Sequence, residues 1–279
     1  MNWLQFSLSY FQKDARNFQL VFLSSFLFYG LFQLNWDHDL PRIIAIVISC
    51  FLSQGIIIRW RNIPFNSFKS AGITALGLCL LLQTDNLWIA VLGGTLAIFS
   101  KTILRFKGRH YFNPANFGLM VTVLITQQAW VSPGQWGNET IMVFFFSAAA
   151  LMVLLKVGRL DTSVIFLLIL FLLEYFRTVI YLGWEPDVLI HQFTNGSLLL
   201  FIFFMITDPK TTPSSPGARL VWAALLAGLS FFITHWFYIS AAPLWVLLFY
   251  APITVLFNQY LPGEEFSWSQ GFTSKIHIK

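Results

Sequence analysis

Charged residues are scarce in this sequence of 279 residues, because Asp, Glu, Lys and Arg together make up only 10% of it. Hydrophobic residues make up 57%, aromatic residues 18%, and the mean hydropathy is +0.68. A water-soluble domain of this length has no use for so much apolar surface. The composition therefore excludes a soluble globular protein and predicts an all-α polytopic membrane protein in contact with the lipid bilayer.

Other absences narrow the function. The two cysteines, Cys50 and Cys79, both lie inside apolar runs, which favours small buried side chains over a disulfide or a metal site. The net charge is +5, but no solvated basic domain is present, so we expect no nucleic-acid partner. The sequence contains no assembly of Ser, His and Asp, no metal-ligand cluster and no Gly-rich phosphate loop. We therefore do not expect an enzyme that acts alone.

Apolar runs separated by turn residues predict about ten membrane spans. They lie near residues 18–35, 41–59, 70–84, 87–105, 115–129, 139–156, 160–182, 188–207, 217–237 and 240–259. The third run would be about 22 Å long as a helix, whereas the hydrocarbon core of a bilayer is about 30 Å thick. We therefore expect this segment to be a broken or re-entrant helix.

The positions of the cations predict the orientation. If all ten segments cross and the N-terminus is cytoplasmic, 15 of the 17 Lys and Arg residues fall on the cytoplasmic side, and only Arg42 and Arg177 fall toward the outside. This predicts cytoplasmic termini in a bacterial-type inner (plasma) membrane. We expect one membrane domain over 1–279, made of an interfacial segment at 1–17, repeats at 18–129 and 139–259, and a cytoplasmic tail at 260–279.

A weak internal repeat relates residues 72–85 to residues 195–208. Three positions are identical, and they pair Leu76 with Leu199, Thr84 with Thr207 and Asp85 with Asp208. Five predicted spans separate the two segments, so they would cross the membrane in opposite directions. This pattern is typical of inverted-topology repeats, whose binding site lies where the two broken segments meet. We therefore expect Asp85 and Asp208 near the midline between the halves.

The most polar stretch of the chain is residues 101–118. Asn113 can cap a helix through its side-chain oxygen, and Pro114 suits the first helical turn because its missing N–H costs nothing there. The helix expected from Ala115 to Ile125 would begin beside four cations and could bind an anion or a polar ring edge. A capped helix start at the cytoplasmic face explains the pattern equally well. The four cations are Lys101, Arg105, Lys107 and Arg109.

Few other side chains suggest chemistry. Glu174 and Arg177 are three residues apart and would share one helix face, so we interpret them as a structural ion pair. His191 and His235 are interpreted as single histidines without partners. Gly93 and Gly94 indicate close helix packing.

Two segments resemble a known family. KGRHYFNPANFG, at residues 107–118, and FMITDPKTTP, at residues 204–213, are similar to the "G-x-x-x-FNPA" and "F-M-x-TDP-x-T-x-P" segments of the RnfD/NqrB family. Its members are the RnfD component of the Rnf complex and the NqrB component of the sodium-pumping NADH:quinone oxidoreductase. The resemblance extends from about Ser70 to about Trp236. It implies two inverted five-helix repeats, a urea-transporter-like fold, and flavin-linked electron transfer with other membrane or membrane-associated redox proteins.

The resemblance also implies site residues and a cofactor. The residues carried over are Phe112, Asn113, Pro114 and Asn116 from the first segment and Thr207, Asp208 and Pro209 from the second; the internal repeat adds Thr84 and Asp85. The best-known members hold FMN covalently at an S/T-G-A-T motif after the fifth span, and residues 130–140 contain no such motif. We therefore expect a non-covalent FMN or riboflavin, or a quinone. Asn113 and Asn116 would face the ring edge, and Tyr111 and Phe112 would stack on the ring.

Two other functions fit the same sequence. One is a urea-transporter-like channel or carrier for a small polar solute, which would use the fold without redox chemistry. The other is a structural membrane subunit whose site is empty.

Overall fold

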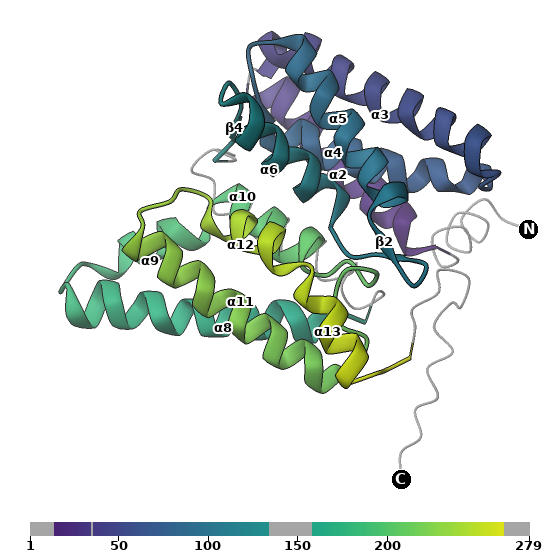
Figure 1. The fold of residues 1–279 in the computed structure, drawn as a ribbon. Coiled ribbons are helices and arrows are strands. Elements are labelled where there is room, and N and C mark those ends of the chain that lie inside the picture. Colours follow the sequence, from purple (N-terminus) through teal and green to yellow (C-terminus); the bar gives the residue numbers. More distant parts are fainter. Residues whose placement is uncertain (1–13, 35, 134–157, 265–279) are drawn as a thin grey trace, which may run out of the picture.

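The computed structural model describes residues 14–34, 36–133 and 158–264 (Figure 1). The predicted span at 139–156, most of the N-terminal segment 1–17 and the end of the tail lie outside the described residues. Within them the chain forms two groups of helices, one from each half of the sequence. In the view of Figure 1 the first half lies above the second.

The first half is built on a central helix, α5, which packs between α3 and α6. The shorter helix α4 packs against α2 and α3. The helices of this half are α2 (Ala15–Gln33), α3 (Leu40–Arg61), α4 (Phe68–Leu81), α5 (Leu87–Ile103) and α6 (Pro114–Thr126), with 3-10 turns η1 (Trp36–Asp39) and η2 (Phe65–Ser67). Four two-residue strands complete it: β1 (Leu82–Gln83) pairs antiparallel with β4 (Trp130–Val131), and β2 (Arg105–Phe106) pairs with β3 (Arg109–His110).

The second half repeats this packing order, because α11 packs between α8 and α12. Helix α12 also packs against α6, which makes these two helices a contact between the halves. The elements are α8 (Leu160–Tyr175), its π-helical continuation η3 (Phe176–Tyr181), α9 (Pro186–Phe193), α10 (Gly196–Leu200), the π-helical η4 (Phe201–Met205), α11 (Pro216–Trp236), α12 (Ala242–Tyr250) and α13 (Ile253–Tyr260).

Three described helices are long and apolar enough to cross a membrane singly: α3, α8 continued by η3, and α11. Two bent pairs raise the number to five if each pair is one span: α9 with α10 and η4, bent by 53°, and α12 with α13, bent by 54°. The first bend agrees with the broken segment expected before Asp208. The second lies within the span predicted at 240–259, which is bent in its middle, and Pro252, which cannot donate a backbone hydrogen bond, lies at the bend.

Helix α4 is short, as the sequence predicts, and its end is stabilised by a buried arginine. It has 14 residues, or about 21 Å of helix, and continues as the extended strand β1. The last carbonyls of a helix lack partners within the helix. Arg42, which is only 3% exposed, donates hydrogen bonds to the carbonyls of Cys79 and Leu82 and forms an ion pair of 2.9 Å with Asp39. Arg42, which the cation distribution assigns to the outer side, thus stabilises the end of the short helix α4.

Close packing at glycines holds the first half together. A Cβ atom added to Gly118 of α6 would lie 2.5 Å from Ala97 Cβ and 2.6 Å from the Gly93 carbonyl of α5. A Cβ atom at Gly94 would collide with Ser49 Oγ of α3. The close approach predicted from Gly93 and Gly94 is therefore confirmed.

Helices α8 and α11 run parallel and are linked near both ends. Near their first residues, Arg219 Nε and Nη2 lie 2.8 and 2.5 Å from Asp161 Oδ2. Near their last residues, His235 Nε2 lies 2.7 Å from Glu174 Oε1. The predicted pairing of Glu174 with Arg177 is therefore wrong. The prediction that His235 has no partner is also wrong, because the packing of α8 against α11 brings His235 to the Glu174 carboxylate.

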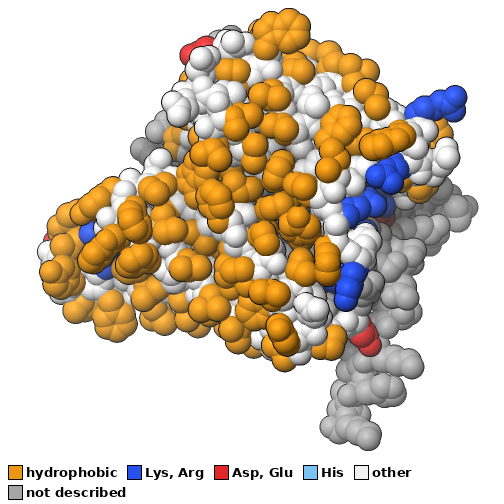
Figure 2. Space-filling view, in the orientation of Figure 1, with side chains coloured by type: hydrophobic (Ala, Val, Ile, Leu, Met, Phe, Trp, Pro, Cys, Tyr) orange, Lys and Arg blue, Asp and Glu red, His pale blue; other side chains and the backbone are white. Residues whose placement is uncertain are grey.

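The surface is largely apolar. Figure 2 shows hydrophobic side chains over most of the visible face, while most of the visible Lys and Arg side chains lie along its right-hand edge. Large side chains such as Leu52, Phe249 and Ile190 are more than half exposed, at 64, 68 and 62%. Such a surface is suited to contact with lipid, with the charges gathered toward one end of the helices.

Candidate functional site

The two segments that carry the family resemblance meet in space, although about 100 residues separate them in the sequence. Asn113 Nδ2 donates to the Met205 carbonyl at 3.3 Å. His110 Nε2 lies 3.8 Å from Asp208 Oδ2. Arg109 Nη2 lies 3.2 Å from the carbonyl oxygens of Pro209 and Lys210. The contact joins the start of α6 and the residues just before it to the end of η4 and the loop that follows.

Asn113 forms hydrogen bonds on both sides of this contact. Its Oδ1 accepts a hydrogen bond of 3.1 Å from the Asn116 backbone N–H, so the predicted cap of α6 is confirmed. Its Nδ2 is already engaged by Met205. Asn116 Nδ2 donates to the Leu244 carbonyl at 3.2 Å and links α6 to α12. The amide nitrogens of both side chains, which the sequence predicts to face a ligand, therefore form hydrogen bonds that join the two halves.

A β-hairpin brings His110 and Arg109 to this contact. Lys107 and Gly108, the two residues between β2 and β3, have φ values of +47° and +81°, as in a type I′ turn. The sequence predicts only a basic loop here, because the turn has Lys-Gly instead of the more common Asn-Gly signal.

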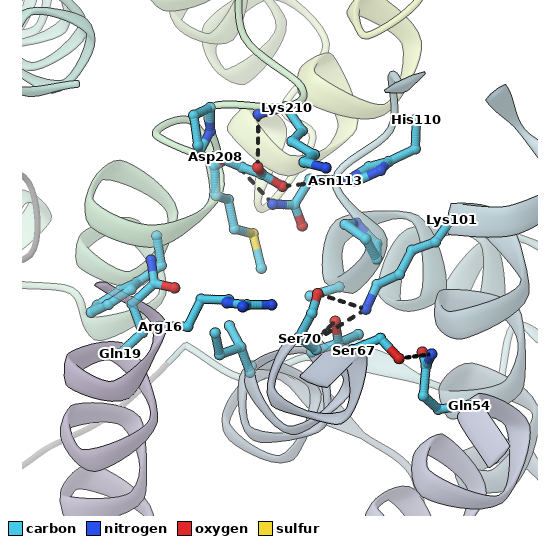
Figure 3. Close-up of a pocket in the computed structure, with 18 of the residues that line it drawn as sticks. Arg16, Gln19, Gln54, Ser67, Ser70, Lys101, His110, Asn113, Asp208 and Lys210 are labelled. Atoms are coloured by element: carbon cyan, nitrogen blue, oxygen red, sulfur yellow. Dashed lines mark hydrogen bonds and ion pairs between the residues drawn. The ribbon is translucent and has the colours of Figure 1, made fainter. Parts of the chain in front are cut away.

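A cavity of about 260 Å³ lies beside the contact and is lined by both halves (Figure 3). Its walls come from α2, α3, α4, α5, the start of α6, η4 and the loop after η4. The polar and charged residues that line it are Arg16, Gln19, Gln54, Ser67, Ser70, Thr74, Lys101, Thr102, Arg105, His110, Asn113, Asp208 and Lys210. Its apolar lining includes Leu23, Ile73, Leu200 and Phe204.

The charge in this cavity is mainly positive. Lys101, at the end of α5, is 8% exposed, and its Nζ donates to Ser70 at 3.1 Å (carbonyl) and 3.2 Å (Oγ), as Figure 3 shows. Arg16 is held by an ion pair of 2.8 Å with Asp14. Arg105 and Lys210 add two more cations, and Asp208 is the acid in the lining. The arrangement favours a ligand that carries or develops negative charge.

Asp208 is held in its ionised form. Burial alone would raise the pKa of its carboxyl group, but His110 and the Lys210 backbone N–H, at 3.0 Å, outweigh this and lower the pKa below its usual value. Burial lowers the pKa of Lys210, although Asp208 partly offsets this effect. The carboxylate can therefore accept a hydrogen bond from a ligand at neutral pH.

The predicted site residues fall into two groups. Those that line the cavity are Asn113, Pro114, Asp208 and Pro209. Those that lie outside its lining are Phe112, Asn116, Thr207, Thr84 and Asp85. Asp85 is exposed and lines a separate open depression with Gln127 and Trp130. The prediction that Asp85 lies near the midline is therefore wrong, because the chain is buried up to Thr84 but reaches the surface at Asp85.

The aromatic residues beside Asn113 pack on one another and do not line the cavity. The rings of Tyr111 and Phe112 are 4.7 Å apart, and those of Phe112 and Phe117 are 5.0 Å apart. The aromatic side chain that lines the cavity is Phe204, in η4. Stacking on a ligand ring would therefore come from the second half and not from Tyr111 or Phe112.

Several lining residues were missed from the sequence. Ser67, just before α4, and Ser70 and Thr74 within it follow one another at intervals of three and four residues, so they form a polar stripe on one helix face. That spacing is visible in the sequence and was a usable signal. Arg16 and Gln19 of α2 gave no such signal, because only the fold brings this helix to the cavity.

These features define a polytopic helical membrane protein with a cationic cavity between its two halves. A model of the NQR2, RnfD, RnfE family matches residues 125–267, which is just over half of the chain, and the chain belongs to this family. Membership places it among the membrane subunits of Rnf- and Nqr-type electron-transport complexes. The match includes the Asp208 loop, while the Asn113 segment precedes it. No individual curated protein matches the sequence.

Proposed function

We propose that this chain is the membrane subunit of a flavin-linked electron-transport complex and that its cationic cavity holds a non-covalent flavin, either FMN or riboflavin. The observation that carries the proposal is the meeting of the two family-like segments at this cavity, through Asn113 with Met205 and His110 with Asp208. Family membership supports the redox role.

The residues present fit such a group. Apolar side chains, including Phe204 and Ile73, would pack on the faces of a flat ring, and hydroxyl and amide groups on α3 and α4 would contact its polar edge. A bound flavin would supply the capacity to accept and release electrons. Lys101 and Arg105 would balance the negative charge of a phosphate or of a reduced ring, and Asp208 would accept a hydrogen bond from a ring N–H.

Non-covalent binding is proposed because residues 130–140 contain no S/T-G-A-T attachment motif. A quinone could use the same partly apolar space, but unlike FMN it would bring no phosphate to the cations. Electrons would enter and leave through partner redox proteins in or on the membrane.

We further propose ten spans in two inverted repeats of a urea-transporter-like fold, with both termini in the cytoplasm and the protein in a bacterial-type plasma membrane. The cation distribution supports the orientation. The packing of α5 between α3 and α6, and of α11 between α8 and α12, supports a repeat of similar units. The cavity would then face the cytoplasmic side, near the clustered cations.

Lys101 provides the test of the site. Lys101→Met removes a buried charge from the cavity lining, whereas Lys107→Met removes an exposed charge outside it. A charged hydrogen bond is worth about 1.5–3 kcal/mol, so we expect flavin affinity to fall roughly tenfold to a hundredfold in the first variant and to stay unchanged in the second.

The measurement is the ratio of flavin to protein after purification in detergent, restricted to the monodisperse fraction so that misfolded protein does not count. Full flavin content in the Lys101 variant would place the flavin elsewhere. A protein that contains quinone and no flavin would refute the cofactor assignment while leaving the cavity intact.

A further inference from the structure

A second cavity, of about 560 Å³, lies among α8, α10, α11 and α12, next to β4. It shares no lining residue with the cationic cavity. The two lie toward opposite ends of the segment formed by α10 and η4: Asn195 and Ser197 line the second cavity, whereas Phe204 and Asp208 line the first. Neither the family resemblance nor the proposed flavin accounts for it.

A buried carboxylate faces this second cavity. Glu174 is 6% exposed and lies in the cavity lining. Its Oε1 is 2.7 Å from His235 Nε2, but its Oε2 is buried and has no hydrogen-bond partner among the described residues. A buried carboxylate oxygen without a donor is energetically costly. Glu174 therefore lines a space large enough for a small molecule and has one oxygen without a donor, which a ligand would reach once the side chain turns toward the cavity.

The hydroxyl groups around the cavity also present acceptors, because their protons are already donated. Ser230 Oγ donates to the Leu226 carbonyl at 2.7 Å, and Thr234 Oγ1 donates to the Ser230 carbonyl at 2.8 Å. Ser197 Oγ donates to Asn195 Oδ1 at 2.7 Å. Ser230 itself is fully buried, but Ser197 and Thr234 are partly exposed, so the lone pairs of their oxygens remain for a ligand. A ligand that fits this lining donates hydrogen bonds and carries positive charge.

We propose that the second cavity binds a primary ammonium group, R–NH₃⁺, through Glu174 Oε2. The three N–H donors of an ammonium match a lining of acceptors, and its charge matches the carboxylate. The apolar lining residues Phe193 and Trp245 suit a non-polar body attached to the ammonium, and aromatic rings also attract cations. The ligand is either a free amine or the headgroup of an aminophospholipid, since both carry the same group.

Calorimetric titration of the full chain in detergent tests the proposal with three probes of similar shape. We expect benzylamine, which is an ammonium at neutral pH, to bind. We expect benzyltrimethylammonium, which keeps the charge but has no N–H donor, and benzyl alcohol, which has no charge, to bind at least tenfold more weakly. Equal binding of all three probes, or no binding of benzylamine, would overturn the proposal.

Variants assign the site. Glu174→Gln keeps the shape and removes the charge, so we expect benzylamine affinity to fall at least tenfold. Glu185→Gln is the matched control, because it removes an exposed glutamate outside the cavity lining. If Glu174→Gln does not fold, Thr234→Val decides: weaker benzylamine binding supports the site, and unchanged binding rejects it.

The source of the ammonium is distinguished in nanodiscs. If the natural ligand is a lipid headgroup, phosphatidylethanolamine discs will weaken benzylamine binding by competition relative to phosphatidylcholine discs. If the natural ligand is a free amine, both discs will give the same affinity. Either result is compatible only with an ammonium site that the first experiment has already detected.

Discussion

At the scale of single residues, the side-chain amide of Asn113 both caps a helix and joins the two halves. Its oxygen caps α6, and its nitrogen ties α6 to the Met205 carbonyl of the other half. The first role follows from the Asn-Pro pair in the sequence. The second could not be predicted, because the sequence gives no indication that Met205, 92 residues further along the chain, lies beside it.

The Asn113→Asp variant separates these roles. Asp keeps the oxygen that caps the helix but places a second oxygen opposite the Met205 carbonyl, where a donor is needed. We expect a loss of about 1–3 kcal/mol in the free energy of unfolding, because a buried acceptor loses its partner and faces another acceptor.

The matched control is Asn86→Asp. Asn86 caps α5 through an oxygen that accepts from the Trp88 N–H at 2.9 Å, and this cap is exposed. We expect this control to unfold at the wild-type temperature, because Asp is as good a cap as Asn. Thermal unfolding in detergent measures both. Equal midpoints for the two variants would show that the bond to Met205 contributes nothing.

Charged pairs show a similar limit at the residue scale. Helical spacing predicts that Glu174 meets Arg177, but Arg177 lies in the π-helical η3, and the parallel packing of α8 and α11 brings His235 to 2.7 Å from the carboxylate. Local spacing identifies which residues can meet within one helix. It does not show which neighbour from another helix arrives closer.

At the scale of elements, the crossing of α5 and α6 depends on Gly118. Gly118→Ala would place a Cβ atom 2.5 Å from Ala97 Cβ and 2.6 Å from the Gly93 carbonyl, and the backbone has little room to move. We expect a loss of about 1–3 kcal/mol in stability from overpacking. Thermal unfolding of the purified protein measures this loss.

Gly228→Ala in α11 is the control for this change, since a Cβ atom there has nothing within 4 Å. Alanine is a better helix former than glycine, so we expect this variant to be as stable as the wild type or slightly more stable. Equal melting temperatures for the two alanine variants would contradict the close crossing.

Most helix positions could be predicted because each is a long apolar run, and the bounds agree within a few residues for α3, α5, α8 with η3, and α11. The shortness of α4 was also visible. The bend between α12 and α13 and the hairpin β2–β3 were not, since the run at 240–259 is apolar on both sides of Pro252 and the turn at Lys107 and Gly108 carries no strong turn signal. Apolar length predicts where a segment lies but not where it bends.

At the scale of the whole molecule, the predicted orientation can be tested with two exposed positions. Asp85→Cys and Lys107→Cys place single thiols in loops that the cation distribution assigns to opposite sides. The natural cysteines, Cys50 and Cys79, are buried and should give no background.

A membrane-impermeant maleimide applied to intact cells should label Asp85→Cys at once and Lys107→Cys only after permeabilisation. Labelling of both variants from the same side would contradict the ten-span orientation and the inverted repeat with it.

The arrangement of the whole molecule places the proposed flavin site between the halves, where neither half alone forms it. The first half supplies most of the cations, including Arg16, Lys101 and Arg105, and the second supplies Asp208, Lys210 and the ring of Phe204. This explains why the sequence could identify the two segments but not the cavity. The polar stripe on α4 and the first turns of α2 come together with the Asp208 loop only when the halves pack.

The most direct test of the central claim is the visible absorption spectrum of the detergent-purified full chain, followed by acid precipitation. We predict flavin bands in the purified protein, full release of the flavin into the acid supernatant, and no fluorescent band on a denaturing gel. A colourless preparation in the monodisperse fraction would contradict the flavin assignment, and flavin that stays with the precipitated protein would contradict non-covalent binding.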